Sequence, residues 1–128
     1  MTTKKRILII EDEREISLIV KLRLQANGYE VLEAFDGQEG LDMAKSMIPD
    51  LILLDLVLPK IGGMQILEEL KGDEQYRKIP IVVVTGISQE AMGLKTSLEK
   101  ADAYFLKPFD SVELMAAIAD FLKKPLEQ

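Results

Sequence analysis

Residues 51–54, Leu-Ile-Leu-Leu, form the most apolar run of the chain, and this run stops at the carboxylic acid Asp55. Three other apolar runs of strand length also end on a polar, chemically reactive side chain. They are residues 6–10 before Glu11 and Asp12, residues 81–84 before Thr85, and residues 103–106 before Lys107. If these runs are neighbouring parallel strands, their ends share one sheet edge, where ligands bind in open α/β sheets.

Segments of helical periodicity separate the apolar runs, and this alternation predicts βαβ units around a parallel sheet. We expect five strands and five helices in strict alternation, with residues 51–54 as the most central strand. Residues 29–34 alternate more between polar and apolar side chains, which is typical of an edge strand. The predicted helices cover residues 14–26, 37–47, 64–72, 88–99 and a last segment that begins after a cap at Asp110 or Ser111.

Helical spacing also predicts which side chains of these helices face the core. In the helix over residues 14–26, the recurring apolar positions are Ile16, Ile19, Val20 and Leu24. In the helix over residues 64–72, they are Ile66, Leu67 and Leu70. In the last helix, the expected apolar stripe is Val112, Met115, Ala116, Ala119 and Leu122.

The composition excludes several classes of function. With 128 residues, 48% of them hydrophobic and 30% charged, the chain is expected to fold as one globular domain over residues 1–128. It contains no His and no Cys, which removes imidazole and thiol chemistry, disulfides and the usual zinc sites. Any bound metal should therefore be a hard ion with oxygen ligands, with Mg²⁺ as the leading candidate and Mn²⁺ as an alternative.

Charge and hydropathy also limit the expected partners. The net charge is −6, and the only basic cluster is Lys4-Lys5-Arg6, so direct binding to nucleic acid is not expected. The apolar runs are far shorter than the roughly 20 residues that span a bilayer. The N-terminus does not resemble a secretory signal. We therefore expect a cytoplasmic protein without a membrane segment.

The acidic residues at the strand ends favour a metal site, although one of them has another explanation. Glu11 and Asp12 repel each other unless a cation compensates, but Asp12 is also a good N-cap for a helix that begins near Arg14. Asp55 is harder to explain in this way, because a carboxylate after four buried apolar residues is costly unless it is paired or bound to metal.

Lys107 and Pro108 form the strongest local signal. A lysine that ends a strand beside carboxylates can neutralise them or hold a phosphate as a point charge. Pro108 permits a cis peptide bond with Lys107, which would fix the direction of the lysine side chain. Taken alone, Lys107 is more readily explained as a surface lysine before a helix-initiating proline, and Thr85 alone says little. Their joint order at the ends of separate strands gives the pattern its weight.

Together these residues resemble the receiver domain of two-component response regulators, along essentially the whole chain. The matching elements are Glu11-Asp12, Asp55, the loop from Pro59 to Gly63, Thr85-Gly86, Tyr104 and Lys107-Pro108-Phe109. The resemblance implies a doubly wound, flavodoxin-like α/β fold, with five parallel strands in the order 2-1-3-4-5 and helices on both faces. It also implies a signalling module, not an enzyme, although one that catalyses its own phosphorylation and dephosphorylation.

The resemblance implies a role for each residue of the site. Asp55 would accept a phosphoryl group, and Thr85 and Lys107 would hold its oxygen atoms. Thr85 and Tyr104 would then form a conformational switch that responds to phosphorylation. The implied metal ligands are Glu11, acting through water, and Asp12, Asp55 and the backbone carbonyl of Val57.

The resemblance also implies partners in a two-component system or phosphorelay. Because the chain has no His, the donor should be a phosphohistidine of a sensor histidine kinase or of a histidine phosphotransfer protein. The receiver would act on a downstream effector protein or on a covalently linked output domain. A homodimer is also compatible with the resemblance.

Two apolar residues are expected to slow the loss of the phosphoryl group. Val57 and Ile87 follow Asp55 and Thr85 by two residues each, and in this fold those positions border the phosphate. Neither side chain can orient an attacking water molecule. We therefore expect slow autodephosphorylation.

Other functions fit the sequence less well. A Mg²⁺-dependent phosphatase with an aspartate nucleophile usually needs a second acid two residues later, where this chain has Val57. A flavin carrier would need aromatic platforms and a phosphate-binding loop after the first strand, and aromatic residues make up only 5% of the chain. A phosphorylation-independent interaction module on the same fold is the main alternative. It would be expected to lose Asp55, Lys107 or the acidic pair, all of which are present.

Overall fold

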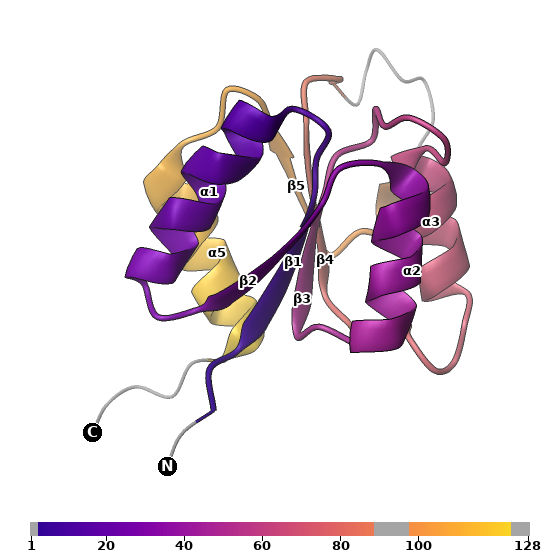
Figure 1. Ribbon diagram of the computed structural model, residues 1–128, viewed down its shortest axis with the longest axis horizontal. Coiled ribbons are helices and arrows are strands. Elements are labelled where there is room, and N and C mark those ends of the chain that lie inside the picture. Colours follow the sequence, from indigo (N-terminus) through magenta and orange to yellow (C-terminus); the bar gives the residue numbers. More distant parts are fainter. Residues whose placement is uncertain (1–2, 89–97, 124–128) are drawn as a thin grey trace.

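The computed structural model of the protein describes residues 3–88 and 98–123. These residues contain a five-stranded parallel sheet with the order β2-β1-β3-β4-β5 (Figure 1). The strands are β1 (Arg6–Ile10), β2 (Glu30–Ala34), β3 (Leu51–Leu54), β4 (Ile81–Thr85) and β5 (Ala103–Leu106). The predicted fold and strand order are confirmed, with β3 at the centre of the sheet and β2 at one edge.

Helices cover both faces of the sheet (Figure 1). In the described residues these are α1 (Arg14–Ala26), α2 (Gly37–Met47), α3 (Gly63–Lys71), α5 (Ser111–Leu122) and a short 3₁₀ helix, η1 (Leu98–Lys100). Helices α1 and α5 pack on one face, and α2 and α3 on the other. The helix that we predicted over residues 88–99 lies largely outside the described residues. None of the helices in the described ranges has the length and apolarity needed to cross a bilayer.

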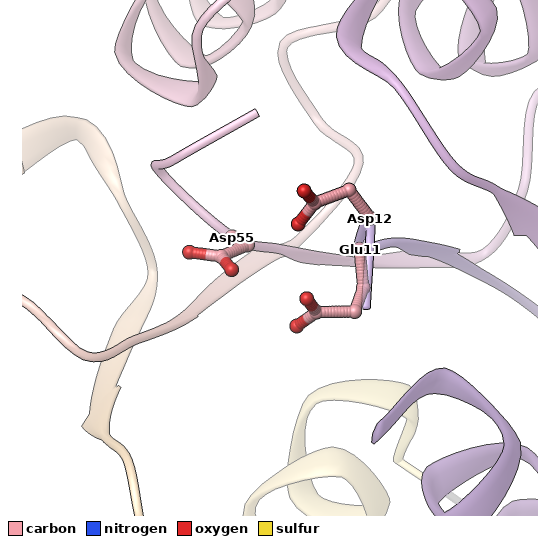
Figure 2. A group of neighbouring side chains, drawn as sticks. All are labelled: Glu11, Asp12 and Asp55. Atoms are coloured by element: carbon pink, nitrogen blue, oxygen red, sulfur yellow. The ribbon is translucent and has the colours of Figure 1, made fainter. Parts of the chain in front are cut away.

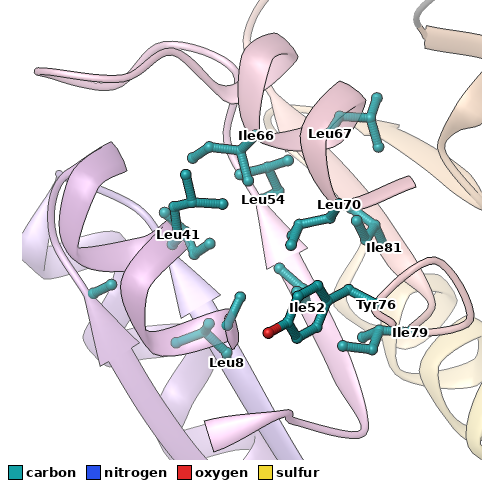
Figure 3. Packing of buried hydrophobic residues seen from close by; sticks show 13 residues of the cluster. Leu8, Leu41, Ile52, Leu54, Ile66, Leu67, Leu70, Tyr76, Ile79 and Ile81 are labelled. Carbon is teal, nitrogen blue, oxygen red and sulfur yellow. The ribbon is translucent and has the colours of Figure 1, made fainter. Parts of the chain in front are cut away.

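Two hydrophobic clusters explain why three strands read as continuous apolar runs. All residues of β3 and β4 are buried, as are four of the five in β1, because both faces of a parallel sheet are covered. Successive side chains of β1 and of β3 enter opposite clusters. The cluster under α2 and α3 includes Leu8, Ile10, Leu41, Ile52, Leu54, Ile66, Leu67, Leu70 and Ile81 (Figure 3). The cluster under α1 and α5 includes Ile7, Ile9, Val20, Leu24, Leu51, Leu53, Val82, Leu114 and Ile118.

The helix starts show which acidic residues act as caps. Asp36 caps α2, where its Oδ1 accepts a hydrogen bond from the backbone N–H of Glu39 at 2.7 Å. Asp110 caps α5 in the same manner. Helix α1 is different: its N-cap residue is Glu13, and no side chain caps it. Asp12 is therefore not the cap of α1, and its carboxylate is available for another role.

Helical spacing predicted the core face of α3 correctly but not that of α5. Ile66 and Leu67 of α3 are fully buried. In α5 the buried residues are Leu114, Ile118 and Leu122, whereas Val112 is 76% exposed. The predicted stripe of α5 was therefore wrong at Val112 and at Ala116, which is also exposed, and it missed Leu114 and Ile118.

The prediction for α1 was also wrong at one position. Val20 and Leu24 are buried as expected, but Ile19 is 59% exposed. Leu18 and Leu22 are about as exposed as Ile19. Since apolar residues lie on both sides of this helix, hydropathy alone does not identify the face that meets the sheet.

Candidate functional site

The three carboxylates predicted at the strand ends lie together. Glu11 and Asp12 directly follow β1, and Asp55 directly follows the neighbouring strand β3. The Asp55 N–H donates to the carbonyl of Ile10 at 3.0 Å, which fixes the end of β3 against the end of β1. One carboxylate oxygen from each residue lies within 4.8 Å of the others. Figure 2 shows the three side chains projecting from the strand ends toward a common space.

Lys107 joins two of these carboxylates. Its Nζ donates to Glu11 Oε1 at 2.7 Å and to Asp55 Oδ2 at 3.0 Å. The backbone N–H of Lys107 donates to the carbonyl of Thr85 at 2.8 Å, so pairing with β4 continues to the residue that carries the ammonium group. The peptide bond between Lys107 and Pro108 is cis.

Backbone N–H groups hold the other oxygen of each buried carboxylate. Glu11 and Asp55 are only 4% and 6% exposed. The N–H of Glu13 donates to Glu11 Oε2 at 3.1 Å, and the N–H of Val57 donates to Asp55 Oδ1 at 3.2 Å. Asp12 is exposed. The site therefore contains two oriented, buried carboxylates and one carboxylate at its solvent side.

Thr85 and Tyr104 lie on neighbouring strands beside this cluster. Thr85 is completely buried, and its Oγ1 has no hydrogen-bond partner among the residues that the structure describes. A buried hydroxyl without a partner is unfavourable, so Thr85 is suited to bind a group that enters the site. The Tyr104 O–H donates to the backbone carbonyl of Ile87, two residues after Thr85.

Burial and the neighbouring charges act in opposite directions on the pKa values of Glu11 and Lys107. Burial raises the pKa of Glu11 above its ordinary value of 4.5, and this outweighs the lowering by its hydrogen bonds with Lys107 and Glu13. Burial lowers the pKa of Lys107, but its hydrogen bonds and its attraction to Glu11 and Asp55 outweigh burial and leave this pKa raised. Lys107 is thus held in its charged form.

The residues present fit a divalent metal ion. Lys107 pairs with two of the three carboxylates, those of Glu11 and Asp55, and one positive charge leaves most of the negative charge of the cluster uncompensated when all three are ionised. Oxygen ligands on one Mg²⁺ lie about 3–4 Å apart, given metal–oxygen distances of about 2.1 Å. Oxygens within 4.8 Å of one another reach that spacing through small side-chain rotations. Glu11, Asp12 and Asp55 would hold the ion.

The raised pKa of Glu11 predicts how stability depends on pH without metal. Above about pH 4.5 the folded protein keeps a proton on Glu11 that the unfolded chain has released. The contribution of Glu11 to the free energy of unfolding therefore falls as pH rises, and it stops falling above the pKa of Glu11 in the folded protein. Glu11→Gln cannot titrate. Its stability relative to the wild type should therefore rise through this range and then level off. Urea unfolding at stepped pH in chelator measures the difference.

A matched control is Glu15→Gln, since Glu15 is exposed on α1. The difference between this variant and the wild type should stay nearly constant over the same pH range. A wild-type protein that gains stability relative to Glu11→Gln as pH rises would contradict the proposed effect of burial on Glu11.

Carboxylates, an ammonium group and a hydroxyl without a partner in the described residues meet at one edge of a parallel sheet. This set of groups on an α/β domain is suited to hold a metal ion and a phosphoryl group. Comparison with known families identifies the class of protein. Residues 7–119 match the family model of the response regulator receiver domain. The chain belongs to this family and is a response regulator receiver domain of two-component systems.

Individual relatives agree with this assignment. The chain is 39% identical over 119 residues to the DNA-binding dual master transcriptional regulator RpaA of Synechocystis sp., covering 93% of this chain and 49% of RpaA. A CheY-like receiver domain protein from Methanospirillum hungatei has a TM-score of 0.84 at 33% identity, covering 95% of this chain and 96% of the other.

A third relative was solved with ligands. The response regulator TrrA of Thermotoga maritima, in complex with Mg²⁺-BeF, has a TM-score of 0.82 at 32% identity, covering 91% of this chain and 98% of that chain. The present chain spans only about half the length of regulators such as RpaA.

The sequence predicted the members of the site but not the backbone groups that orient them. The donors from Glu13 and Val57 to the carboxylates lie two residues after their acceptors, and no side chain marks them. The contact between α2 and the loop after Asp55 was also missed. The feature of the sequence that could have indicated this contact is Gly37, directly after the cap residue Asp36.

Proposed function

We propose that this receiver domain accepts a phosphoryl group on Asp55 and signals through Thr85 and Tyr104. The observation that carries the proposal is the pair of short contacts from Lys107 Nζ to the buried carboxylates of Glu11 and Asp55. These contacts bring together residues that are far apart in the chain. Carboxylates are an established class of nucleophile for this transfer.

The reaction transfers a phosphoryl group between two side chains. One carboxylate oxygen of Asp55 forms a bond to phosphorus, and the bond between phosphorus and the ring nitrogen of a donor phosphohistidine breaks. The electron pair of that bond returns to the donor imidazole, and Asp55 becomes an acyl phosphate. Such transfer depends mainly on positioning and charge stabilisation, which buried, hydrogen-bonded groups provide.

Each neighbouring residue has a role in this transfer. Lys107 would move from its contact with Asp55 to an oxygen of the incoming phosphoryl group, and the Thr85 hydroxyl would donate to another. Bound Mg²⁺ would supply positive charge that offsets the repulsion between the phosphoryl group and the carboxylates. The Mg²⁺-BeF complex of TrrA supports this assignment of the metal. The backbone carbonyl of Val57 would be a further ligand.

The switch follows from the position of Thr85. A hydrogen bond from Thr85 to the phosphoryl group would draw the end of β4 toward Asp55. The carbonyl of Ile87 lies just beyond, and it accepts the hydrogen bond from the Tyr104 hydroxyl. Movement of this backbone would change the hydrogen bond and release or reorient the Tyr104 side chain. Phosphorylation at one site would thus change the surface around β5.

The proposed partners follow from the proposed chemistry. The donor is the phosphohistidine of a sensor histidine kinase or of a histidine phosphotransfer protein in the cytoplasm. The output is either a separate effector protein or a domain linked to this one, and relatives such as RpaA are about twice as long as this chain. A homodimer is a third route of output. In each case the protein acts as a signalling module and not as an enzyme on a separate substrate.

Transfer to Asp55 is expected to require Mg²⁺. Without a metal ion, Glu11, Asp12 and Asp55 repel an incoming phosphoryl group, and Lys107 alone cannot compensate. Incubation with acetyl phosphate and Mg²⁺ should add the mass of one phosphoryl group, as measured on the intact protein. The same incubation in excess chelator should leave the mass unchanged. Phosphorylation at an equal rate in chelator would refute the metal requirement.

Val57 is expected to prolong the phosphorylated state. Its side chain is 57% exposed and apolar, so it cannot orient a water molecule toward the acyl phosphate. Val57→Asn adds a polar side chain at this position and should speed dephosphorylation roughly 3- to 10-fold by positioning water. The decay of the phosphorylated mass after removal of acetyl phosphate measures this rate. Val57→Leu is the matched control and should decay like the wild type; equal rates in all three proteins would exclude a role for residue 57.

A further inference from the structure

The loop between β3 and α3 contains a strained turn. The N–H of Ile61 donates to the carbonyl of Pro59 at 2.9 Å, which closes a three-residue turn. Its central residue, Lys60, has a φ of 72° although it is not glycine. Three-residue turns with positive φ at the centre are rare and strained. Such a backbone persists only where the surrounding structure holds it in place.

The start of α2 holds this turn. The N–H of Gly37 donates to the same carbonyl of Pro59 at 3.0 Å. A Cβ on Gly37 would lie 1.7 Å from the carbonyl oxygen of Ile61, so the two backbones approach more closely than any side chain permits. Asp36, the cap of α2, also pairs with Lys60 at 3.5 Å. The start of α2 thus contacts the turn at three points.

The other end of the same loop forms part of the functional site. Val57 N–H donates to Asp55 Oδ1 at 3.2 Å, and the Val57 carbonyl is an expected metal ligand. The first residue of α3, Gly63, packs against the Asp55 backbone, where a Cβ would lie 2.2 Å from the Asp55 carbonyl oxygen. Between these two anchors, the turn held by Gly37 constrains the path of the loop, together with the packing of Leu58 and Ile61 on the core.

We infer that Gly37 is a positioning residue for the metal site. Because Gly37 has no side chain, α2 can hold the turn over residues 59–61 in its strained form. The position of this turn then determines where the Val57 carbonyl lies relative to Asp55. The inference rests on the proposed metal site, but it does not depend on phosphoryl transfer. It connects the start of α2 with ion binding at the ends of β1 and β3.

Two alanine variants test this inference with the full chain. Gly37→Ala forces the turn away from α2, because the clash is with backbone atoms of Ile61. Gly62→Ala is the matched control in the same loop, since its Cβ would have only one contact, with the carbonyl oxygen of Leu56 at 3.9 Å. Electron paramagnetic resonance of free Mn²⁺ measures metal affinity, at a temperature where circular dichroism shows both variants folded. Gly37→Ala should bind Mn²⁺ at least about tenfold more weakly than the wild type, and Gly62→Ala within about twofold.

A measurement on the wild type covers the case in which Gly37→Ala does not fold. If metal binding favours the intact contact, saturating Mg²⁺ should slow exchange of the Gly37 amide hydrogen several-fold, because the coupling is reciprocal. Amides within α2, such as that of Ala44, should change less. An unchanged Gly37 exchange rate would overturn the inference.

The outcomes separate the inference from the proposed function. If folded Gly37→Ala binds Mn²⁺ as tightly as the wild type does, the positioning role of Gly37 alone is overturned. Equal weakening in Gly62→Ala would also overturn it, since any change in the loop would then suffice. A wild-type protein that binds no Mn²⁺ would overturn the metal site and the inference together. Failure of Asp55 to accept a phosphoryl group would leave the Mn²⁺ result standing.

Discussion

Replacing Asp55 by asparagine is expected to abolish phosphorylation. The amide oxygen of Asn carries no charge and is a poor nucleophile, so the rate of transfer from acetyl phosphate with Mg²⁺ should fall by at least about 10³-fold. The fold should survive, because Asn has nearly the same size and can still accept the hydrogen bond from the N–H of Val57. Lys107 keeps its contact with Glu11. Intact-protein mass spectrometry measures the rate.

The matched control is Asp42→Asn, which makes the same change on an exposed residue of α2 that contacts only Gln38 in the described hydrogen bonds. Asp42→Asn should be phosphorylated at the wild-type rate. Phosphorylation of Asp55→Asn at that rate would show that another residue accepts the phosphoryl group.

Replacing Lys107 by methionine is expected to lower both stability and the rate of transfer. Methionine keeps much of the apolar stem but leaves the buried carboxylates of Glu11 and Asp55 without their shared cation. Breaking such a buried pair should cost about 2–4 kcal/mol of unfolding free energy in chelator. Transfer at saturating Mg²⁺ should slow at least about tenfold, because one donor to the phosphoryl oxygens is lost. Urea unfolding and mass spectrometry measure the two effects.

Magnesium should narrow the stability difference between Lys107→Met and the wild type, because a divalent ion replaces the lost positive charge and binding to the folded state adds stability. The control is Lys45→Met, which removes an ion pair with Glu69 that is partly open to solvent. This change should cost less than about 1 kcal/mol and leave transfer unchanged. Equal losses in the two variants would contradict the account of Lys107.

The polar residue after each apolar run could be predicted because parallel strands bring their ends to the same edge. The order of the strands then followed from the family resemblance, and the structure agrees with it. Asp12 was ambiguous in the sequence, since an acid before a helix is also a typical cap. The start of α1 at Arg14, with Glu13 as its uncapped N-cap residue, resolves this ambiguity.

The core face of α5 could not be predicted because the helix is apolar on several sides. Val112 and Leu114 are both apolar, yet one is 76% exposed and the other is fully buried. Hydrophobic periodicity selects a face only where polar residues mark the opposite one. The same reason explains Ile19 in α1, which shares an exposed apolar surface with Leu18 and Leu22.

Close backbone contacts were beyond prediction for a different reason. Gly37 and Lys60 are more than twenty positions apart in the chain, and neither has a side chain that indicates a partner for its backbone. A glycine after a cap residue is compatible with an ordinary helix start. Only the position of the turn over residues 59–61 shows that a side chain on Gly37 would clash.

Asp55 itself is expected to carry the phosphoryl group. Borohydride reduces an acyl phosphate and converts the modified aspartate to homoserine, which marks the position permanently. After reaction with acetyl phosphate and Mg²⁺, reduction and peptide mass mapping should find homoserine at position 55 and at no other acidic residue. Homoserine at position 12, or at any aspartate outside the strand-end cluster, would contradict the account, as would a reacted protein without homoserine.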